Sequence, residues 1–219
     1  MPKRIIILGD SLAMPRPDDN IKYEDTYSYL LQNNNCEVIN RSKRSNDSKI
    51  QTNSQNILDD IVYLNPNIVI IHLGIVDCAP RLFTRNEARV LSVMPNYLSK
   101  IIISFFSKYR YIFTKIRQIS YVGEVHFKKN LEYLIKKLQS LDIDILIIKI
   151  LETNQENIRR SYKFEENIHR YNLIISKISH NYNIREIDIN GYDNILLKDG
   201  IHINKSGHNA IYKKLKGLV

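Results

Sequence analysis

Short apolar runs alternate along the chain with longer amphipathic segments. The runs are rich in isoleucine and valine and mostly continuous, a pattern typical of strands that are covered on both faces. Five strands are predicted on this basis: Ile5–Leu8, Val38–Ile39, Ile68–Leu73, Ile143–Ile150 and Ile184–Ile189. Because helical segments separate them, we expect a three-layer α/β/α arrangement around a mostly parallel sheet of five strands.

The segments between the runs carry apolar residues at spacings of three and four, the period of an amphipathic helix. Polar residues that can cap a helix precede some of these segments. The predicted helices are Thr26–Gln32 with Asp25 as its cap, one from Ser48 to about Tyr63, Glu124–Leu141, Phe164–Tyr182, and a last one from about Lys205 to Lys216. We expect them to cover both sides of the sheet.

The segment from Asn96 to Val122 departs from this alternation, because it is apolar and basic and contains no acidic residue. Its apolar residues form one stripe at helical spacing, with lysines and arginines on the other faces. The stripe consists of Leu98, Ile101, Ile102, Phe105, Tyr109, Ile112, Phe113, Ile116 and Ile119. We predict a helical insert at about 96–122. Four roles are open for it: packing on the domain as a helix or helix pair, contact with a membrane surface, a lid, or a dimer contact.

The chain of 219 residues is long enough to bury one sizeable core, and we expect a single domain over residues 1–219. Lysine and arginine total 32 against 23 aspartate and glutamate residues, a net charge of +9. This excess favours anionic partners. Nucleic acid is not expected among them, because the basic residues form no established motif and bulky aliphatic residues interleave those of the insert. The oligomeric state stays open.

Other features favour a protein of the cytoplasm that needs no cofactor. Cys36 and Cys78 do not form a disulfide framework or a Cys/His cluster, and no helix-spaced histidine pair indicates a metal. No glycine-rich phosphate loop is present. Met1-Pro2-Lys3-Arg4 leads directly into the first predicted strand, so no signal peptide is expected. The apolar stretches are too short to span a membrane, which leaves peripheral contact with the inner membrane surface through the insert.

Candidate chemistry begins at Gly9-Asp10-Ser11-Leu12, directly after the first predicted strand. Gly9 permits a sharp turn, and Ser11 then lies at the carboxyl end of a parallel strand, where open α/β sheets bind ligands. A serine hydroxyl needs a neighbouring base to become a good nucleophile. Asp199-Gly200-Ile201-His202 offers one, and its spacing lets a tight turn bring the carboxylate to the ring. These residues indicate a hydrolase or an acyl transferase.

The two motifs resemble the first and last sequence blocks of the SGNH/GDSL hydrolases, and the residues after His202 resemble that family's approach to its final helix. The blocks are distributed from residue 9 to residue 202, so the resemblance covers the whole chain. It implies the flavodoxin-like SGNH hydrolase fold. It also implies that Ser11 is the nucleophile, His202 the general base, and Asp199 the group that orients the imidazole.

The two middle blocks differ from the family pattern. The third block is usually Gly-x-Asn-Asp, whose asparagine donates to the oxyanion, but here it reads Gly74-Ile75-Val76-Asp77. Loss of one such donor typically costs about 2.7–4 kcal/mol of transition-state stabilisation. Asn46 is the best match to the glycine of the second block, and asparagine tolerates left-handed backbone. We expect an oxyanion hole formed by the N–H groups of Ser11 and Asn46, with Gly74 as a further candidate.

Arg81 follows the third block and is a candidate for the missing donor. Its alternative roles are binding of an anionic substrate and a surface salt bridge. Asp10 and Asp77 are the other candidate substrate-binding residues, although Asp77 is better suited to anchoring loops. Cys78 is expected to be a small buried thiol rather than a nucleophile.

The stretch Gly74–Arg81, G-I-V-D-C-A-P-R, resembles a subgroup of SGNH proteins associated with bacterial surface-polysaccharide synthesis. The resemblance implies an esterase that hydrolyses an O-acyl ester, foremost O-acetyl, on a sugar or polysaccharide precursor through a Ser-His-Asp triad. The expected partner is thus a small-molecule or glycan ester, and the basic charge of the chain leaves an anionic one open. Two alternatives are open. One is an O-acetyltransferase that passes the acyl group to a sugar hydroxyl, and the other is a non-catalytic scaffold protein, which Val76 favours.

Overall fold

Five parallel strands form one central sheet in the order β2-β1-β3-β4-β5. The computed structural model describes residues 2–33 and 35–219. The strands are β1 (Lys3–Gly9), β2 (Cys36–Asn40), β3 (Ile68–His72), β4 (Asp144–Ile148) and β5 (Arg185–Ile187). This confirms the predicted five-stranded parallel sheet. It follows from the apolar runs, since every residue from Ile5 to Leu8 is fully buried.

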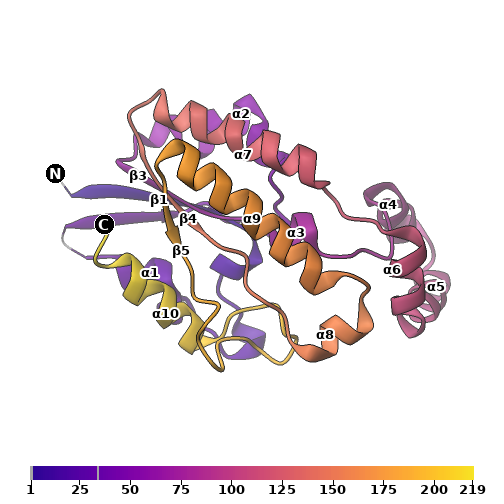
Figure 1. Cartoon of the computed structure of the whole chain (residues 1–219). Coiled ribbons are helices and arrows are strands. Elements are labelled where there is room, and N and C mark those ends of the chain that lie inside the picture. The colour runs from indigo at the N-terminus through magenta and orange to yellow at the C-terminus, as the bar shows by residue number, and fades with distance from the viewer. Residues whose placement is uncertain (1, 34) are drawn as a thin grey trace.

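Helices cover both faces of this sheet, as Figure 1 shows, with α2, α7 and α9 on one side and α1 and α10 on the other. Alternate residues of β1 enter the two cores, because successive side chains of a strand point to opposite faces. Ile6 and Leu8 pack with residues of α7 and α9, whereas Ile5 and Ile7 pack with residues of α1 and α10. The five helices are α1 (Tyr27–Leu31), α2 (Ser54–Asp60), α7 (Glu124–Gln139), α9 (Phe164–Tyr182) and α10 (Lys205–Leu215).

Two predicted helix starts are wrong. Thr26 rather than Asp25 caps α1, because its hydroxyl accepts from the N–H of Tyr29, while Asp25 ends a short 3-10 turn, Tyr23–Asp25. The predicted helix from Ser48 begins only at Ser54, where Asn53 is the cap. The backbone N–H and hydroxyl of Ser48 bind a distant carboxylate instead, a tertiary contact that local sequence does not reveal.

The predicted insert at about 96–122 forms two helices, α5 (Asn96–Lys108) and α6 (Arg110–Arg117), and a further helix that was not predicted, α4 (Arg85–Val93), precedes them; the three together are called the insert from here on. It lies at one end of the molecule, beyond the short helix α3 (Ile75–Cys78) (Figure 1). Of the four roles left open for the insert, packing of the whole apolar stripe on the domain does not fit the structure. α5 contains no buried residue, and six of the nine stripe residues are exposed: Leu98, Ile101, Phe105, Tyr109, Ile112 and Ile116.

α6 is held to the domain by polar residues instead. The guanidinium of Arg110 donates to the Ser161 hydroxyl (2.8 Å) and to the Pro80 carbonyl (2.9 Å). Ser161 follows α8 (Gln155–Arg160), a short helix that was not predicted. Within the described ranges, no helix combines the length and the apolar character needed to cross a bilayer.

Candidate active site

A serine, a histidine and an aspartate from the two ends of the chain meet at the carboxyl edge of the sheet. The hydroxyl oxygen of Ser11 lies 3.0 Å from Nε2 of His202. Nδ1 of the same ring lies 2.6 Å from Oδ2 of Asp199. The ring thus contacts the hydroxyl through one nitrogen and the carboxylate through the other, although 191 residues separate Ser11 from His202.

The position of Ser11 is set by the end of β1. Asp10 follows the strand and caps the 3-10 turn Ser11–Ala13, because its Oδ1 accepts from the N–H of Leu12 (2.8 Å). The N–H of Asp10 donates to the carbonyl of His72 in the neighbouring strand (3.3 Å). These bonds fix the turn on both sides of the serine.

Asp10 itself is fully buried. Burial raises its pKa to about 7, with Asp77 adding to the shift, while the Leu12 N–H and the charge of Arg81 oppose it. Asp77 is also fully buried and accepts from the N–H (3.0 Å) and the hydroxyl (2.6 Å) of Ser48. Burial raises its pKa to about 6. Both carboxyl groups therefore anchor loops in this structure, and the predicted role in substrate binding does not fit their burial.

The loop of Asp199 and His202 is shaped by its own hydrogen bonds. Oδ1 of Asp199 accepts from the backbone N–H groups of Ile201 and His202, each at 2.9 Å. Burial raises the pKa of Asp199, but the bonds from the His202 ring and these two N–H groups outweigh it, and the pKa lies below its usual value. Gly200 has a left-handed φ of 67°, where a Cβ would overlap the side chain of Asn154.

A polar segment after β4 holds this loop in place. The side-chain amide of Asn157 donates to the carbonyl of Asp199 (2.7 Å), and the hydroxyl of Thr153 donates to that of Gly200 (2.7 Å). Sequence reasoning missed these supports. The polar run Thr153–Asn157, a few residues after the end of β4, was the signal that could have indicated them.

The candidate oxyanion residues are not equivalent. The register pairs Gly9 with His72, so Ser11 and Gly74 follow adjacent strand ends at equal spacing. Gly74 has a φ of 131° and no room for a Cβ beside Ile150. The N–H of Asn46 donates within a turn to the carbonyl of Lys43 (3.2 Å). The expected left-handed residue is Ser45 rather than Asn46, so the predicted backbone donor at Asn46 does not fit the structure.

Arg81 contacts the backbone of Val76, the residue that stands in the third block where the family has its asparagine. Its guanidinium donates to the backbone carbonyl of Val76 (3.1 Å) and lies over the Tyr121 ring, 4.5 Å from the centroid. Its Nε is buried and has no partner among the residues that the structure describes. Burial lowers the pKa of Arg81, an effect that neighbouring groups including Asp10 oppose. The half-buried guanidinium is thus anchored at one nitrogen and unpartnered at another.

The model of the GDSL-like lipase/acylhydrolase family matches residues 7–210. The chain belongs to this family. As a GDSL-like acylhydrolase it is an enzyme that hydrolyses esters. The predicted resemblance to the SGNH/GDSL hydrolases and the predicted fold are both confirmed.

Solved structures with this fold include three esterases or lipases. The acetyl xylan esterase AlAXEase is 19% identical, with a TM-score of 0.68 and 99% of both chains covered. The lipase/acylhydrolase from Enterococcus faecalis is 15% identical, with a TM-score of 0.64, 99% of this chain and 96% of that chain covered. An acetyl xylan esterase from Geobacillus stearothermophilus is 15% identical, with a TM-score of 0.63, and the match covers 97% of this chain and 92% of that chain. No curated protein matches the chain.

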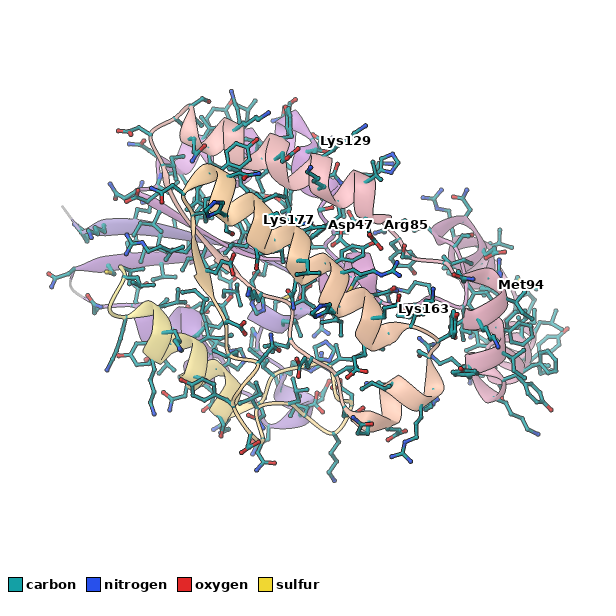
Figure 2. All side chains as sticks on the ribbon, in the orientation of Figure 1. Asp47, Arg85, Met94, Lys129, Lys163 and Lys177 are labelled. Atoms are coloured by element: carbon teal, nitrogen blue, oxygen red, sulfur yellow. The ribbon has the colours of Figure 1, made fainter. Side chains whose placement is uncertain are left out.

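The remaining residues at the edge of this GDSL-like site are a cysteine and a second arginine. Burial raises the pKa of the Cys78 thiol, and its fully buried position fits a packing residue. Arg85 was not predicted. Its guanidinium lies over the Tyr121 ring, the same ring that Arg81 contacts, 4.4 Å from the ring centroid. Arg85 also forms an ion pair with buried Asp47, toward which it points in Figure 2.

Proposed function

We propose that this GDSL-like acylhydrolase is a serine esterase that removes an O-acyl group, foremost acetyl, from a sugar or polysaccharide precursor. The observation that carries the proposal is the chain of contacts from Ser11 through His202 to Asp199, at 3.0 and 2.6 Å. Nδ1–H of His202 donates to the carboxylate, which leaves the lone pair of Nε2 facing the serine hydroxyl.

In the first half of the proposed reaction, Oγ of Ser11 attacks the ester carbonyl carbon while Nε2 of His202 takes the hydroxyl proton. The carboxylate of Asp199 stabilises the imidazolium that forms. The tetrahedral intermediate then collapses, the bond to the sugar oxygen breaks, and Nε2 returns the proton to that oxygen. The products are the free sugar hydroxyl and an acyl group on Ser11.

In the second half, water takes the place of the sugar. Nε2 of His202 removes a proton from the water as its oxygen attacks the acyl carbonyl carbon. Collapse of this second intermediate breaks the bond to Oγ of Ser11, which receives the proton from Nε2. The carboxylic acid leaves, and the enzyme returns to its starting state.

For the developing oxyanion we propose the N–H groups of Ser11 and Gly74 together with the guanidinium of Arg81. Ser11 is the first residue of its 3-10 turn, where an N–H has no partner within the turn. The contact between Arg81 and the Val76 carbonyl supports its role as the substitute for the absent asparagine side chain. A cationic donor aimed at developing negative charge is an effective form of transition-state stabilisation.

An anionic sugar ester is the substrate class that we propose. Arg81 is not neutralised by an ion pair in the described part of the chain, unlike Arg85, which pairs with Asp47. Arg110 lies in the same positive surroundings, since burial and the charges of Arg81 and Arg160 lower its pKa. The acetyl xylan esterases among the similar structures support the sugar and the acetyl group. We further propose that the enzyme acts in surface-polysaccharide synthesis. Its place would be the reducing cytoplasm, where Cys36 and Cys78 stay free thiols.

Two measurements test the proposal. A fluorophosphonate probe should label the wild type and not Ser11→Ala. Acetate release should be faster from an acetylated sugar that carries a carboxylate than from its neutral counterpart. When a free sugar is added as a second acceptor, the acetyl group should still go mainly to water. No labelling would overturn the catalytic assignment, and acyl transfer exceeding acetate release would make the enzyme an acetyltransferase.

A further inference from the structure

Large apolar side chains lie exposed along one face of α5 and α6. We call this the insert face and define it by Tyr97, Leu98, Ile101, Phe105, Tyr109, Ile112 and Ile116. Ile101, Ile112 and Ile116 are 64%, 52% and 72% exposed. Single exposed apolar residues need no explanation, but a contiguous set of this kind on two adjacent helices marks an interaction surface.

Part of the other side of the two helices is covered by contacts between half-buried aromatic rings, although Ile103 and Tyr111 are exposed there as well. Phe106 stacks on Phe113 with ring centroids 4.2 Å apart and contacts Phe83 at 4.9 Å. Arg117 ties α6 to the start of the insert through the Leu82 carbonyl (2.6 Å) and the carboxylate of Glu87 (2.5 Å). The aromatic residues of the inner side therefore fix how the two helices sit together and leave the isoleucines in solvent.

The surroundings of the insert face are strongly basic. Between Thr84 and Val122 the chain has a single acidic residue, Glu87, which is engaged by Arg117. Its basic residues are Arg85, Arg89, Lys100, Lys108, Arg110, Lys115 and Arg117. Lys100, Lys108 and Lys115 are exposed on the two helices that carry the isoleucines. Apolar bulk beside unpaired basic charge is the signature of a helix that lies in the interface of an anionic bilayer.

We propose that α5 and α6 dock the enzyme on the surface of a bilayer containing anionic lipid. This inference goes beyond the proposed esterase function and does not depend on it. Charge argues against a second copy as the occupant, since a symmetric contact would bring two strongly basic surfaces together with no acidic partner beyond the engaged Glu87. Shape argues for a bilayer, because the helices project at the end of the molecule (Figure 1) and a bilayer accepts protruding apolar side chains.

Docking has a consequence for the site. Figure 1 shows the insert beyond α3, which follows the carboxyl end of β3, the sheet edge where Ser11 also lies. An enzyme bound through the insert face would hold this edge of the sheet toward the membrane rather than its amino edge. Such an orientation suits an ester group carried on or near a lipid.

Vesicle flotation with the full chain tests the proposal. We expect binding to vesicles of equal parts phosphatidylcholine and phosphatidylglycerol, at least tenfold weaker binding to pure phosphatidylcholine, and loss of binding as salt screens the charges. Ile101→Ser, Ile112→Ser and Ile116→Ser combined should reduce binding at least tenfold, and so should Lys100→Glu, Lys108→Glu and Lys115→Glu combined. Both combined variants should keep the melting temperature and the soluble-ester hydrolysis rate of the wild type.

Matched controls lie on α7 and α9. Lys129 and Lys177, labelled in Figure 2, and Leu173 are exposed away from the insert. Lys129→Glu with Lys177→Glu, and Leu173→Ser, should bind vesicles with at least half the wild-type affinity. Absence of binding by the wild type, or equal binding by the triple isoleucine variant, would overturn the proposal. A wild-type dimer that the triple variant converts to a monomer, without vesicle binding, would assign the face to a second copy.

Discussion

The carboxylate of Asp199 holds the ring and the backbone of His202 at the same time. Its Oδ2 lies 2.6 Å from Nδ1 of the ring, and its Oδ1 accepts from the backbone N–H at 2.9 Å. The Asp199 side chain thus fixes both the backbone position of His202 and the orientation of its imidazole ring. The first prediction follows from this double contact.

Asp199→Asn should keep the loop but impair the reaction. The amide oxygen can still accept from the backbone, whereas the amide cannot stabilise an imidazolium or fix the productive tautomer. We expect kcat to fall on the order of 10⁴-fold with little change in KM. Steady-state hydrolysis of an acetyl ester measures this. The exposed Asp193→Asn is the control, and an Asp199→Asn enzyme within tenfold of the wild type would contradict the assigned role.

Gly200→Ala should damage the same loop through its backbone. Gly200 has a φ of 67°, and a Cβ there would overlap Asn154, whose segment supports the loop. We expect loss of about 1–3 kcal/mol of folding stability and a lower kcat, measured by urea unfolding and ester hydrolysis. Gly191→Ala is the matched control, because no atom lies within 4 Å of its added Cβ. Equal behaviour of the two variants would show that Gly200 does not constrain the site.

Arg81→Met should lower kcat on a neutral acetyl ester about 10²–10³-fold, the effect typical of losing one oxyanion donor. KM for that ester should change little, because the contact strengthens only in the transition state. Arg89→Met, which removes an exposed arginine of the insert, serves as the control.

A rescue variant separates the two roles of Arg81. Val76→Asn introduces the side chain that the family has in its third block, so Val76→Asn combined with Arg81→Met should recover part of the lost kcat. If Arg81→Met instead raises only the KM of carboxylate-bearing substrates, the arginine binds substrate and does not serve the oxyanion.

The stability of the fold should depend on pH through two buried histidines beside Tyr27. Nδ1 of His72 lies 3.1 Å from the Tyr27 hydroxyl, and Nδ1 of His208 accepts from the Tyr27 N–H at 3.4 Å. Burial lowers the pKa of His72 to about 3 and that of His208 to about 4. Below about pH 6.5 these histidines therefore bind protons in the unfolded chain that they do not bind in the native state, and their contribution lowers the free energy of unfolding as the pH falls.

Each histidine contributes at most ~1.4 kcal/mol per pH unit in this range. His208→Asn keeps an acceptor near Nδ1 and removes one titrating group, so its free energy of unfolding should rise relative to that of the wild type as the pH falls from 6.5 to 4. Buried Asp10 and Asp77, whose pKa values are raised to about 7 and about 6, act with the opposite sign in the same pH range, but equally in both proteins. Urea unfolding at several pH values measures the difference, which should be constant above pH 7. Parallel curves down to pH 4 would contradict the prediction.

The sequence by itself determined the sheet and the three residues that meet in the candidate active site. A continuous apolar run such as Ile68–Leu73 consists of consecutive residues, so it can be identified without knowledge of distant contacts. Burial of the strand on both faces follows from the run. The two short motifs around Ser11 and His202 are likewise local, and strand order brings them to one edge once the parallel sheet forms. Helix ends were less determined, because capping at Thr26 and Asn53 competes with other polar residues nearby.

Tertiary structure decided which residues hold the loops of the site in place. The support of Gly200 by Thr153 joins residues 47 positions apart, and the contact of Ser48 with Asp77 joins residues 29 positions apart, so only packing brings these partners together. The insert shows the same limit, since its spacing predicted helices but not which side would be covered. Periodicity records that a stripe is apolar, whereas its burial depends on whether the rest of the chain supplies a surface to meet it.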